Sequence, residues 1–177
     1  MGVRRVRPEE WEELRAVRLR ALEESPDSFG STAVEGQRRG DGDWRAWADA
    51  GARSPSTAVF VAEHAGRFVG LCGSFLHEDD ARTAQIVAMW VAPDQRGRRL
   101  GEELLAVASE WSADQGAEEL VLDVTETNRS ARRLYARAGF RETGVTAPLR
   151  SNPALRTVEM RKELRQVESP AASRPAA

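Results

Sequence analysis

The chain carries the stretch QRGRRLG at residues 95–101 and the stretch NRSARRLYARAGF at residues 128–140. Each follows a segment with the pattern of a β-strand, and each runs into apolar residues with helical spacing. Alone, either stretch is also consistent with an ordinary helix end. In this order and spacing they predict a phosphate-binding loop followed by a helix that carries the only tyrosine of the chain, Tyr135.

The first stretch lies at a predicted helix start. Residues 84–91 alternate as a strand does, and apolar residues recur with helical spacing from Leu100. The first backbone N–H groups of a helix lack acceptors and favour an anion, which Gly97 and Gly101 would allow to approach closely. Three arginines would add donors for phosphate oxygens: Arg96, Arg98 and Arg99. The alternative is an exposed, arginine-rich turn that binds nothing.

The second stretch predicts a strand followed directly by a helix. Residues 120–125 alternate as a short strand, Asn128 is a suitable N-cap, and Gly139 suits the left-handed end of a helix. The expected inner face consists of Ala131, Leu134, Tyr135 and Ala138. Tyr135 therefore points inward, where a core tyrosine bonded to a backbone carbonyl is the alternative to a catalytic one.

Together, these residues resemble the signatures of the GNAT superfamily of acetyl-CoA-dependent N-acetyltransferases. The signature Asn-x-x-Ala-x-x-Leu-Tyr-x-x-x-Gly-Phe is matched at Asn128, Ala131, Leu134, Tyr135, Gly139 and Phe140. The phosphate-loop signature Arg/Gln-x-x-Gly-x-Gly/Ala is matched at Arg96 and Gly101, but Arg99 stands where the central glycine is usual.

The resemblance covers roughly residues 3–163 and implies one α/β domain. Its sheet would be mixed and mostly antiparallel, flanked by helices, with two central strands that splay apart. We expect residues 1–163 to form this domain. Residues 164–177 are rich in proline, alanine and serine, which predicts a disordered tail.

The resemblance also implies an enzyme that uses acetyl-CoA as its co-substrate. The pyrophosphate would bind at residues 96–101, which are Arg96, Gly97, Arg98, Arg99, Leu100 and Gly101. The pantetheine arm would bind along Met89, Trp90 and Val91 and near Asn128 and Ala131. Tyr135 would protonate the departing CoA thiolate.

The reaction needs a neutral amine, and therefore a proton acceptor. In similar family members an acidic residue at the position of Asp123 serves as the base, directly or through water. An alternative is that Asp123 only caps a turn or pairs with an arginine. A further acidic run supplies the runner-up candidates for the base: Glu78, Asp79 and Asp80. Such runs are more often only solvated turns.

The acceptor amine is not encoded in any pattern of the chain. The resemblance implies a small-molecule amine or a protein or peptide amine, and the segment before residue 50 would fold over it. Phe29, Trp44 and Trp47 would then line its pocket, although such aromatics are more often core residues. Rivals to the enzyme are a non-catalytic acyl-CoA sensor and a protein-interaction module on the same fold.

Composition sets the outer limits. A chain of 177 residues with 41% hydrophobic residues forms one domain, and its net charge of −2 argues against a general nucleic-acid binder. A single cysteine, Cys72, excludes an internal disulfide, and His64 and His77 show no metal-ligand spacing, so we expect no metal. Neither a leader peptide nor an apolar run of bilayer length is visible, which predicts a cytoplasmic protein without a membrane partner. Family members are often dimers, so a homodimer is expected as one option.

Two segments carry weaker expectations. Residues 34–50 predict a helical region broken by Gly40 and Gly42. Residues 146–154 predict a loop, because they contain Pro148 and Pro153.

Overall fold

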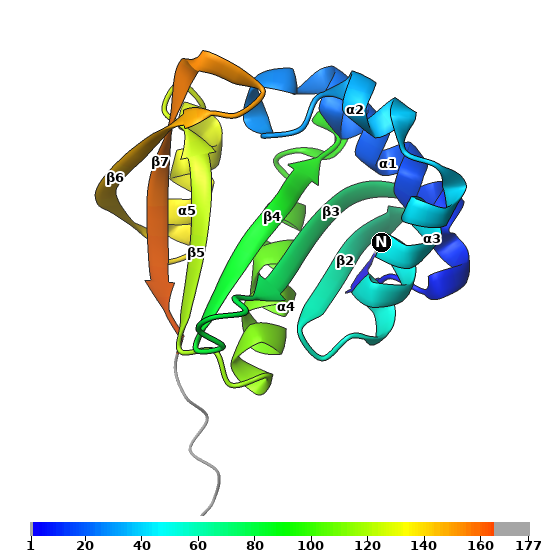
Figure 1. Ribbon diagram of the computed structural model, residues 1–177, viewed down its shortest axis with the longest axis horizontal. Helices are drawn as coiled ribbons and strands as arrows, with labels where there is room; N and C mark the ends of the chain where they lie inside the picture. Colours follow the sequence, from blue (N-terminus) through cyan, green and yellow to red (C-terminus); the bar gives the residue numbers. More distant parts are fainter. Residues whose placement is uncertain (1, 165–177) are drawn as a thin grey trace, which may run out of the picture.

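The computed structural model describes residues 2–164. They form one seven-stranded sheet in the order β1-β2-β3-β4-β5-β7-β6 (Figure 1). Strands β4 and β5 are parallel, and the other neighbouring strands are antiparallel. The predicted mixed, mostly antiparallel sheet is therefore confirmed. The predicted tail lies outside the described residues apart from Leu164.

The strands, helices and 3₁₀ turns have the following bounds. The strands are β1 (Gly2–Arg5), β2 (Thr57–His64), β3 (Arg67–Leu76), β4 (Thr83–Val91), β5 (Glu119–Thr125), β6 (Arg141–Leu149) and β7 (Asn152–Glu163). The helices are α1 (Trp11–Glu24), α2 (Ala33–Arg38), α3 (Asp41–Arg53), α4 (Leu100–Asp114) and α5 (Arg129–Arg137). Three short 3₁₀ turns are η1 (Pro8–Glu10), η2 (Pro26–Ser28) and η3 (Pro93–Gln95). Helix α4 lies behind the sheet in the view of Figure 1, and α3 lies in front of it.

The two central strands separate after a short paired segment. Strand β4 pairs with β5 only over Thr83 to Gln85, opposite Glu119 to Val121. Further along β4, Ala88 has a φ of +55°, and the register with β3 shifts there. An extra residue in one strand bends and twists that strand, so the end of β4 turns away from β5. The expected splay of the central strands is confirmed.

The prediction of a loop over residues 146–154 is wrong. Strand β6 continues to Leu149 and β7 begins at Asn152, so only two residues connect them. Strand β6 is the edge of the sheet, where Pro148 loses no ladder hydrogen bond by lacking an N–H. The edge position therefore tolerates a residue that the sequence pattern assigns to a loop.

The helical region at residues 34–50 is two helices. Gly40 is the N-cap of α3, as the predicted break implies, but Gly42 lies within the first turn of α3 and does not interrupt it. Asp43 accepts a hydrogen bond from the Gly40 backbone N–H, which supports that turn. Within residues 2–164, no helix is long and apolar enough to cross a membrane.

Candidate active site

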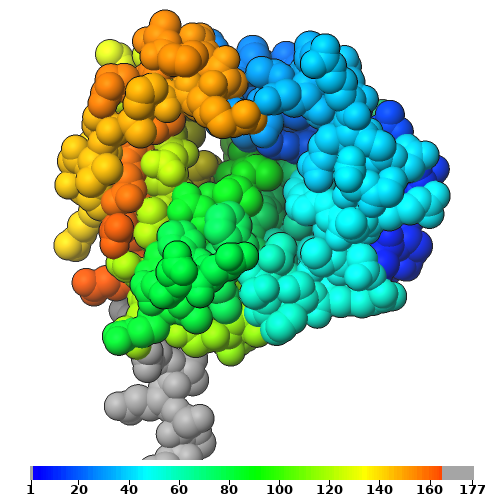
Figure 2. Space-filling view, in the orientation of Figure 1, coloured from blue at the N-terminus to red at the C-terminus, as the bar shows by residue number. Residues whose placement is uncertain are grey.

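A cavity of about 550 Å³ opens where β4 and β5 diverge. Its walls come from the η2 segment, the end of β4, the loop before α4, strand β5 and helix α5. In Figure 2 the surface is hollowed between the orange hairpin of β6 and β7 and the green end of β4. The structure brings together every expected cofactor-contact residue except Arg98: Met89, Trp90, Val91, Arg96, Gly97, Arg99, Leu100, Gly101, Asn128, Ala131 and Tyr135.

The loop before α4 contains two residues with left-handed backbone. Gly97 has a φ of +79°, and Arg99, the N-cap of α4, has a φ of +64°. Arg99 thus adopts a conformation that usually favours glycine, at the position where the family signature has one. The side chain of the N-cap residue Arg99 makes no capping hydrogen bond within residues 2–164, which leaves the leading N–H groups of α4 available to an anion.

Gly101 allows two elements to pack closely. A Cβ at this position would lie 3.0 Å from Leu134 Cδ2 and 3.3 Å from Met89 Cε. The absent side chain therefore lets the start of α4 approach both α5 and β4. A Cβ at Gly97 would meet nothing within 4 Å, so Gly97 serves the backbone conformation and not packing.

Arg96 is held by protein groups. Its Nε donates to the Val91 carbonyl at 3.0 Å, and its Nη2 donates to Glu24 Oε2 at 2.8 Å. Trp90 Nε1 donates to the same carboxylate oxygen at 2.9 Å. Burial raises the pKa of Glu24, but hydrogen bonds from Ser25, Trp90 and Arg96 outweigh it, and the net shift is downward. The guanidinium of Arg96 therefore connects the loop to the end of β4 and to the end of α1.

Helix α5 begins as predicted and carries Tyr135 into the cavity wall. The Asn128 side chain accepts a hydrogen bond from the Ala131 N–H at 3.1 Å and donates to Ser28 Oγ at 3.2 Å. The Tyr135 ring is 7% exposed and packs edge-on against Phe140, with 5.9 Å between centroids.

The Tyr135 hydroxyl has no protein partner in the part of the chain that the structure describes. The hydroxyl oxygen is also not fully buried, as expected for an atom that faces the cavity. The alternative, a core tyrosine bonded to a backbone carbonyl, therefore finds no such bond. Burial, followed by the nearby Cys72 thiol, raises the pKa of Tyr135 and keeps the phenol protonated.

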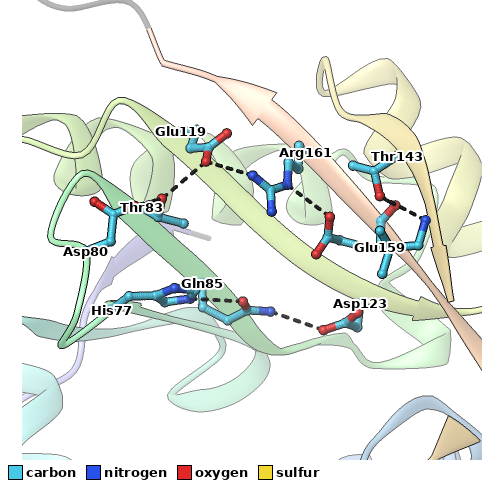
Figure 3. Close-up of polar contacts among 10 residues, drawn as sticks. His77, Asp80, Thr83, Gln85, Glu119, Asp123, Thr143, Glu159 and Arg161 are labelled. Atoms are coloured by element: carbon cyan, nitrogen blue, oxygen red, sulfur yellow. Dashed lines mark hydrogen bonds and ion pairs between the residues drawn. The ribbon is translucent and has the colours of Figure 1, made fainter. Parts of the chain in front are cut away.

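Asp123 lies on β5 and lines the same cavity. Its Oδ2 accepts a hydrogen bond from Gln85 Nε2 at 3.4 Å, and its register partner on β7 is Glu159 (Figure 3). The side chain is exposed, yet surrounding atoms displace enough water to raise its pKa, and the Glu159 carboxylate raises it further. The hydrogen bond from Gln85 acts in the opposite direction. Within residues 2–164 no arginine pairs with Asp123, contrary to the alternative role.

The runner-up bases lie elsewhere. Glu78, Asp79 and Asp80 do not line the cavity but form the turn before β4. Asp80 Oδ2 accepts a hydrogen bond from Thr83 Oγ1 at 2.7 Å, and its Oδ1 accepts one from the Arg82 N–H at 3.2 Å. This acidic run is therefore part of an exposed turn, which is the alternative to a catalytic role.

The three aromatic residues expected to line an acceptor pocket lie in different surroundings. Phe29 lines the cavity, whereas Trp44 and Trp47 do not. Trp44 is fully buried in the core, and Trp47 packs on it with 5.8 Å between ring centroids. For these two tryptophans the alternative interpretation as core residues fits, and the expectation that they line this pocket is wrong.

Hydrogen bonds and an ion pair join segments around the cavity that are distant in sequence. Ser151, in the turn between β6 and β7, donates from Oγ to the Phe29 carbonyl at 2.6 Å. Arg150 in the same turn pairs with Glu35 on α2 at 3.0 Å. Thr125 Oγ1 donates to the Asp27 carbonyl at 2.6 Å. Figure 1 shows the resulting arch, where the orange hairpin reaches the blue segment before α2.

Several lining residues were not anticipated. Arg133 and Arg137 lie one turn apart on α5 and face the cavity beside the loop before α4. Their spacing in the stretch at residues 128–140 is a signal for a shared helix face that sequence analysis did not use. Gln85, which donates to Asp123, gave no signal because its partner belongs to a different strand.

The chain matches the family model described as "Acetyltransferase (GNAT) family" over residues 11–140. It is 34% identical over 92 residues to a putative [ribosomal protein bS18]-alanine N-acetyltransferase of Bacillus subtilis, covering 52% of this chain and 59% of that protein. It is 33% identical over 127 residues to a mycothiol acetyltransferase of Clavibacter sepedonicus, covering 70% of this chain and 39% of that protein. The matched part thus spans about half the length of these curated relatives.

Solved structures share the fold at low sequence identity. A GNAT-family acetyltransferase from Streptococcus pneumoniae superposes with a TM-score of 0.77 at 20% identity, covering 93% of this chain and 99% of that one. A putative acetyltransferase from Salmonella typhimurium, solved with its cofactor acetyl-CoA, gives a TM-score of 0.78 at 18% identity, covering 97% and 98%.

Proposed function

Since the chain belongs to the GNAT family of acetyltransferases, we propose that it moves the acetyl group of acetyl-CoA to a primary amine by direct attack in a ternary complex. The observation that carries this proposal is that Tyr135 and Asp123 line one cavity from two elements, with the loop before α4 at its edge. A proton donor and a proton acceptor are thereby available to the same bound reactants.

The residues of the cavity fit acetyl-CoA. N–H groups at the start of α4 suit a pyrophosphate, and three arginines line the same cavity: Arg99, Arg133 and Arg137. Arg137 also pairs with Glu102 at 3.2 Å. Arg98 adjoins them in sequence but does not line the cavity, so we assign it a weaker contribution. Arg96, which pairs with Glu24, would act by holding the loop.

The end of β4 suits an extended amide-containing arm. Past Gln85, β4 has no pairing with β5, so the edge of residues 89–91 facing β5 keeps backbone groups without strand partners, apart from the Val91 carbonyl, which accepts from Arg96. Such groups need hydrogen bonds, and an extended ligand with amides supplies them in the manner of an added strand. We assign the pantetheine arm to this edge, next to Asn128 and Ala131.

Acetyl-CoA supplies a thioester carbonyl that an amine can attack. Asp123 accepts the amine proton, directly or through water, and its raised pKa makes it a better acceptor than an ordinary aspartate. Tyr135 donates a proton to the departing sulfur, and its raised pKa keeps that proton available at neutral pH. No covalent intermediate on the protein is required.

The acceptor belongs to one of two classes. The relatives are named for an alanine of a ribosomal protein and for mycothiol. We therefore propose either a protein or peptide amine or a small-molecule amine as the acceptor. The cytoplasmic location, the homodimer and the absence of nucleic-acid and membrane partners stay predictions from the sequence.

The test is a thiol-release assay with acetyl-CoA and a panel of amines. The panel pairs peptides with a free N-terminal alanine against the same peptides with a blocked N-terminus, and adds small amino sugars and polyamines. Release above the no-amine rate with any member supports the proposal. A thermal shift with acetyl-CoA but no release with any amine would favour a sensor, and no shift would favour an interaction module.

A further inference from the structure

Gln85 occupies the point at which the central strands part. It is the last residue of β4 that pairs with β5, opposite Val121. Asp123 lies two positions beyond Val121 and projects from the same face of β5, because strand side chains alternate. The Gln85 side chain therefore reaches along the opening between the strands toward the cavity.

A row of three side chains leads to Asp123. His77 Nε2 lies 3.3 Å from Gln85 Oε1, and Gln85 Nε2 lies 3.4 Å from Asp123 Oδ2. Figure 3 shows the row along β4 and β5, with His77 at the end away from Asp123. The His77 backbone N–H donates to the Thr83 carbonyl at 3.0 Å, and its ring packs near Phe75 at 5.9 Å between centroids.

The row has a fixed direction. A carboxylate accepts hydrogen bonds only, so the amide nitrogen of Gln85 must face Asp123. The amide oxygen then faces His77 and requires a proton on its Nε2. A flipped amide would place its oxygen against the Asp123 carboxylate, where two acceptors oppose each other, and the hydrogen bond to Asp123 would be lost.

The charged groups of the described chain near Asp123 do not supply it with a hydrogen-bond donor, which makes the Gln85 amide important. Glu159 approaches from β7, and Arg161 on the same strand is engaged by Glu159 and by Glu119, each at 2.9 Å. From the turn before β4, His77 reaches Asp123 only through Gln85. Among the described residues, Gln85 is thus the side chain that donates to Asp123.

We propose that Gln85 is a positioning residue for Asp123, holding the carboxylate toward the cavity, and that His77 supports Gln85 by a second hydrogen bond to its amide oxygen. This inference rests on the proposed role of Asp123 as the proton acceptor. It extends the site to the β3–β4 connection, outside the cavity wall.

The central experiment is Gln85→Leu, which keeps a similar size and removes the donor. Loss of a hydrogen bond to the charged form raises the pKa of a carboxyl group, so the acidic limb of the kcat profile should move to higher pH by about 0.5 to 1 unit. At neutral pH kcat should fall about three- to tenfold, while KM for acetyl-CoA stays unchanged. NMR titration of ¹³C-labelled aspartate would report the same shift of Asp123 without any turnover.

Two control variants match these changes. Gln115→Leu alters an exposed glutamine at the end of α4, and it should leave both the kcat profile and the Asp123 titration unchanged. His77→Asn should move the acidic limb in the same direction as Gln85→Leu but less. His64→Asn, at the other histidine of the chain, should not move it. Melting curves should be alike for all four variants.

The outcomes separate this inference from the proposed function. If Asp123→Asn retains the parental profile, Asp123 is not the base, and the inference falls with that role. If Asp123→Asn lowers kcat but Gln85→Leu leaves the profile and the titration unmoved, only the positioning role is overturned. In the Asp123→Asn background, Gln85→Leu should have no further effect on kcat, and an additive loss would also overturn it.

Discussion

Arg96, in the loop before α4, donates to Glu24 at the end of α1 across 2.8 Å. The pair joins the segment expected to bind the cofactor to the segment that continues into Ser25, Ser28 and Phe29, which line the same cavity. Both side chains are partly exposed, at 49% for Arg96 and 35% for Glu24, so the pair adds little to global stability. Its effect should therefore appear in ligand binding.

The first prediction follows from this pair. Glu24→Ala removes no expected phosphate contact, yet it should raise KM for acetyl-CoA about three- to tenfold, because the loop loses its brace. Arg96→Ala should have a similar effect, and the double variant should be no worse than either single one. The free energy of unfolding should change by about 1 kcal/mol or less for Arg96→Ala. Glu24→Ala should cost about 1 kcal/mol more, because Trp90 Nε1 also loses its acceptor. Steady-state kinetics and a melting curve check this, and additive losses would instead assign Arg96 to the phosphates.

The second prediction concerns Gly101. Acetyl-CoA at about a hundred times its dissociation constant should stabilise the fold by about 2.7 kcal/mol. Gly101→Val should remove most of that gain, because its side chain would displace Leu134 and the start of α4 from their present packing. Gly42→Val, in the first turn of α3 with nothing within 4 Å of its Cβ position, is the matched control and should keep the full shift.

A second substitution that makes room beside residue 101 should show whether Gly101 is needed for packing against Leu134. Gly101→Ala places a Cβ 3.0 Å from Leu134 Cδ2, and Leu134→Ala removes that atom. The double variant should recover part of the acetyl-CoA thermal shift that Gly101→Ala loses. A shift that is the same for the parent and Gly101→Val would mean that this loop does not bind the cofactor.

The third prediction concerns Asp123. Asp123→Asn should keep acetyl-CoA binding and lower kcat most at low pH, where few acceptor amines are neutral without a base. Raising the pH should partly restore turnover. Glu159→Gln should move the acidic limb in the opposite direction from Gln85→Leu, toward lower pH, because Glu159 raises the pKa of Asp123. The kcat profiles of the three variants against pH check both expectations, and an Asp123→Asn profile that matches the parent would place the base elsewhere.

The fourth prediction concerns the direct route of transfer. Cys72 is fully buried, and burial raises the pKa of its thiol to about 12, so it is a poor nucleophile at neutral pH. Cys72→Ala should retain most of the turnover at a cost of about 1 kcal/mol in stability. Mass spectrometry after incubation with acetyl-CoA alone should show no acetylated protein. An acetyl adduct that disappears in Cys72→Ala would demonstrate a covalent intermediate.

The parts of the site that sequence analysis anticipated are those set by local chemistry. The cap at Asn128, the left-handed Gly139 and the inward face with Tyr135 all depend on residues within one helix. Their spacing fixes them whatever surrounds the helix. The same holds for α4, whose start at Leu100 follows from the glycine-containing turn and helical spacing.

The parts it did not anticipate depend on contacts between distant segments. Arg96 is adjacent to glycines in sequence, but its acceptor is Glu24, 72 positions earlier. Gln85 and Asp123 meet only because β4 and β5 are neighbours up to the point where they separate. Arg99 departs from the family signature, which has glycine at this position. The structure shows that Arg99 nevertheless adopts the left-handed backbone conformation.

The fifth prediction concerns Tyr135, which lines the cavity and whose hydroxyl has no protein partner among the residues described. Tyr135→Phe keeps the ring and its edge contact with Phe140, and it removes no hydrogen bond within the described chain. Stability should therefore change by about 1 kcal/mol or less, and acetyl-CoA affinity should hold.

Turnover of Tyr135→Phe should fall roughly 10²- to 10⁴-fold, the usual contribution of a positioned general acid, because thiolate would then leave without a proton. No other tyrosine exists in the chain to replace the phenol. The decisive measurement is kcat beside a melting curve taken with and without acetyl-CoA. A folded variant that binds acetyl-CoA and turns over at the parental rate would reduce Tyr135 to a packing residue. Protonation of the sulfur would then have to come from water in the cavity.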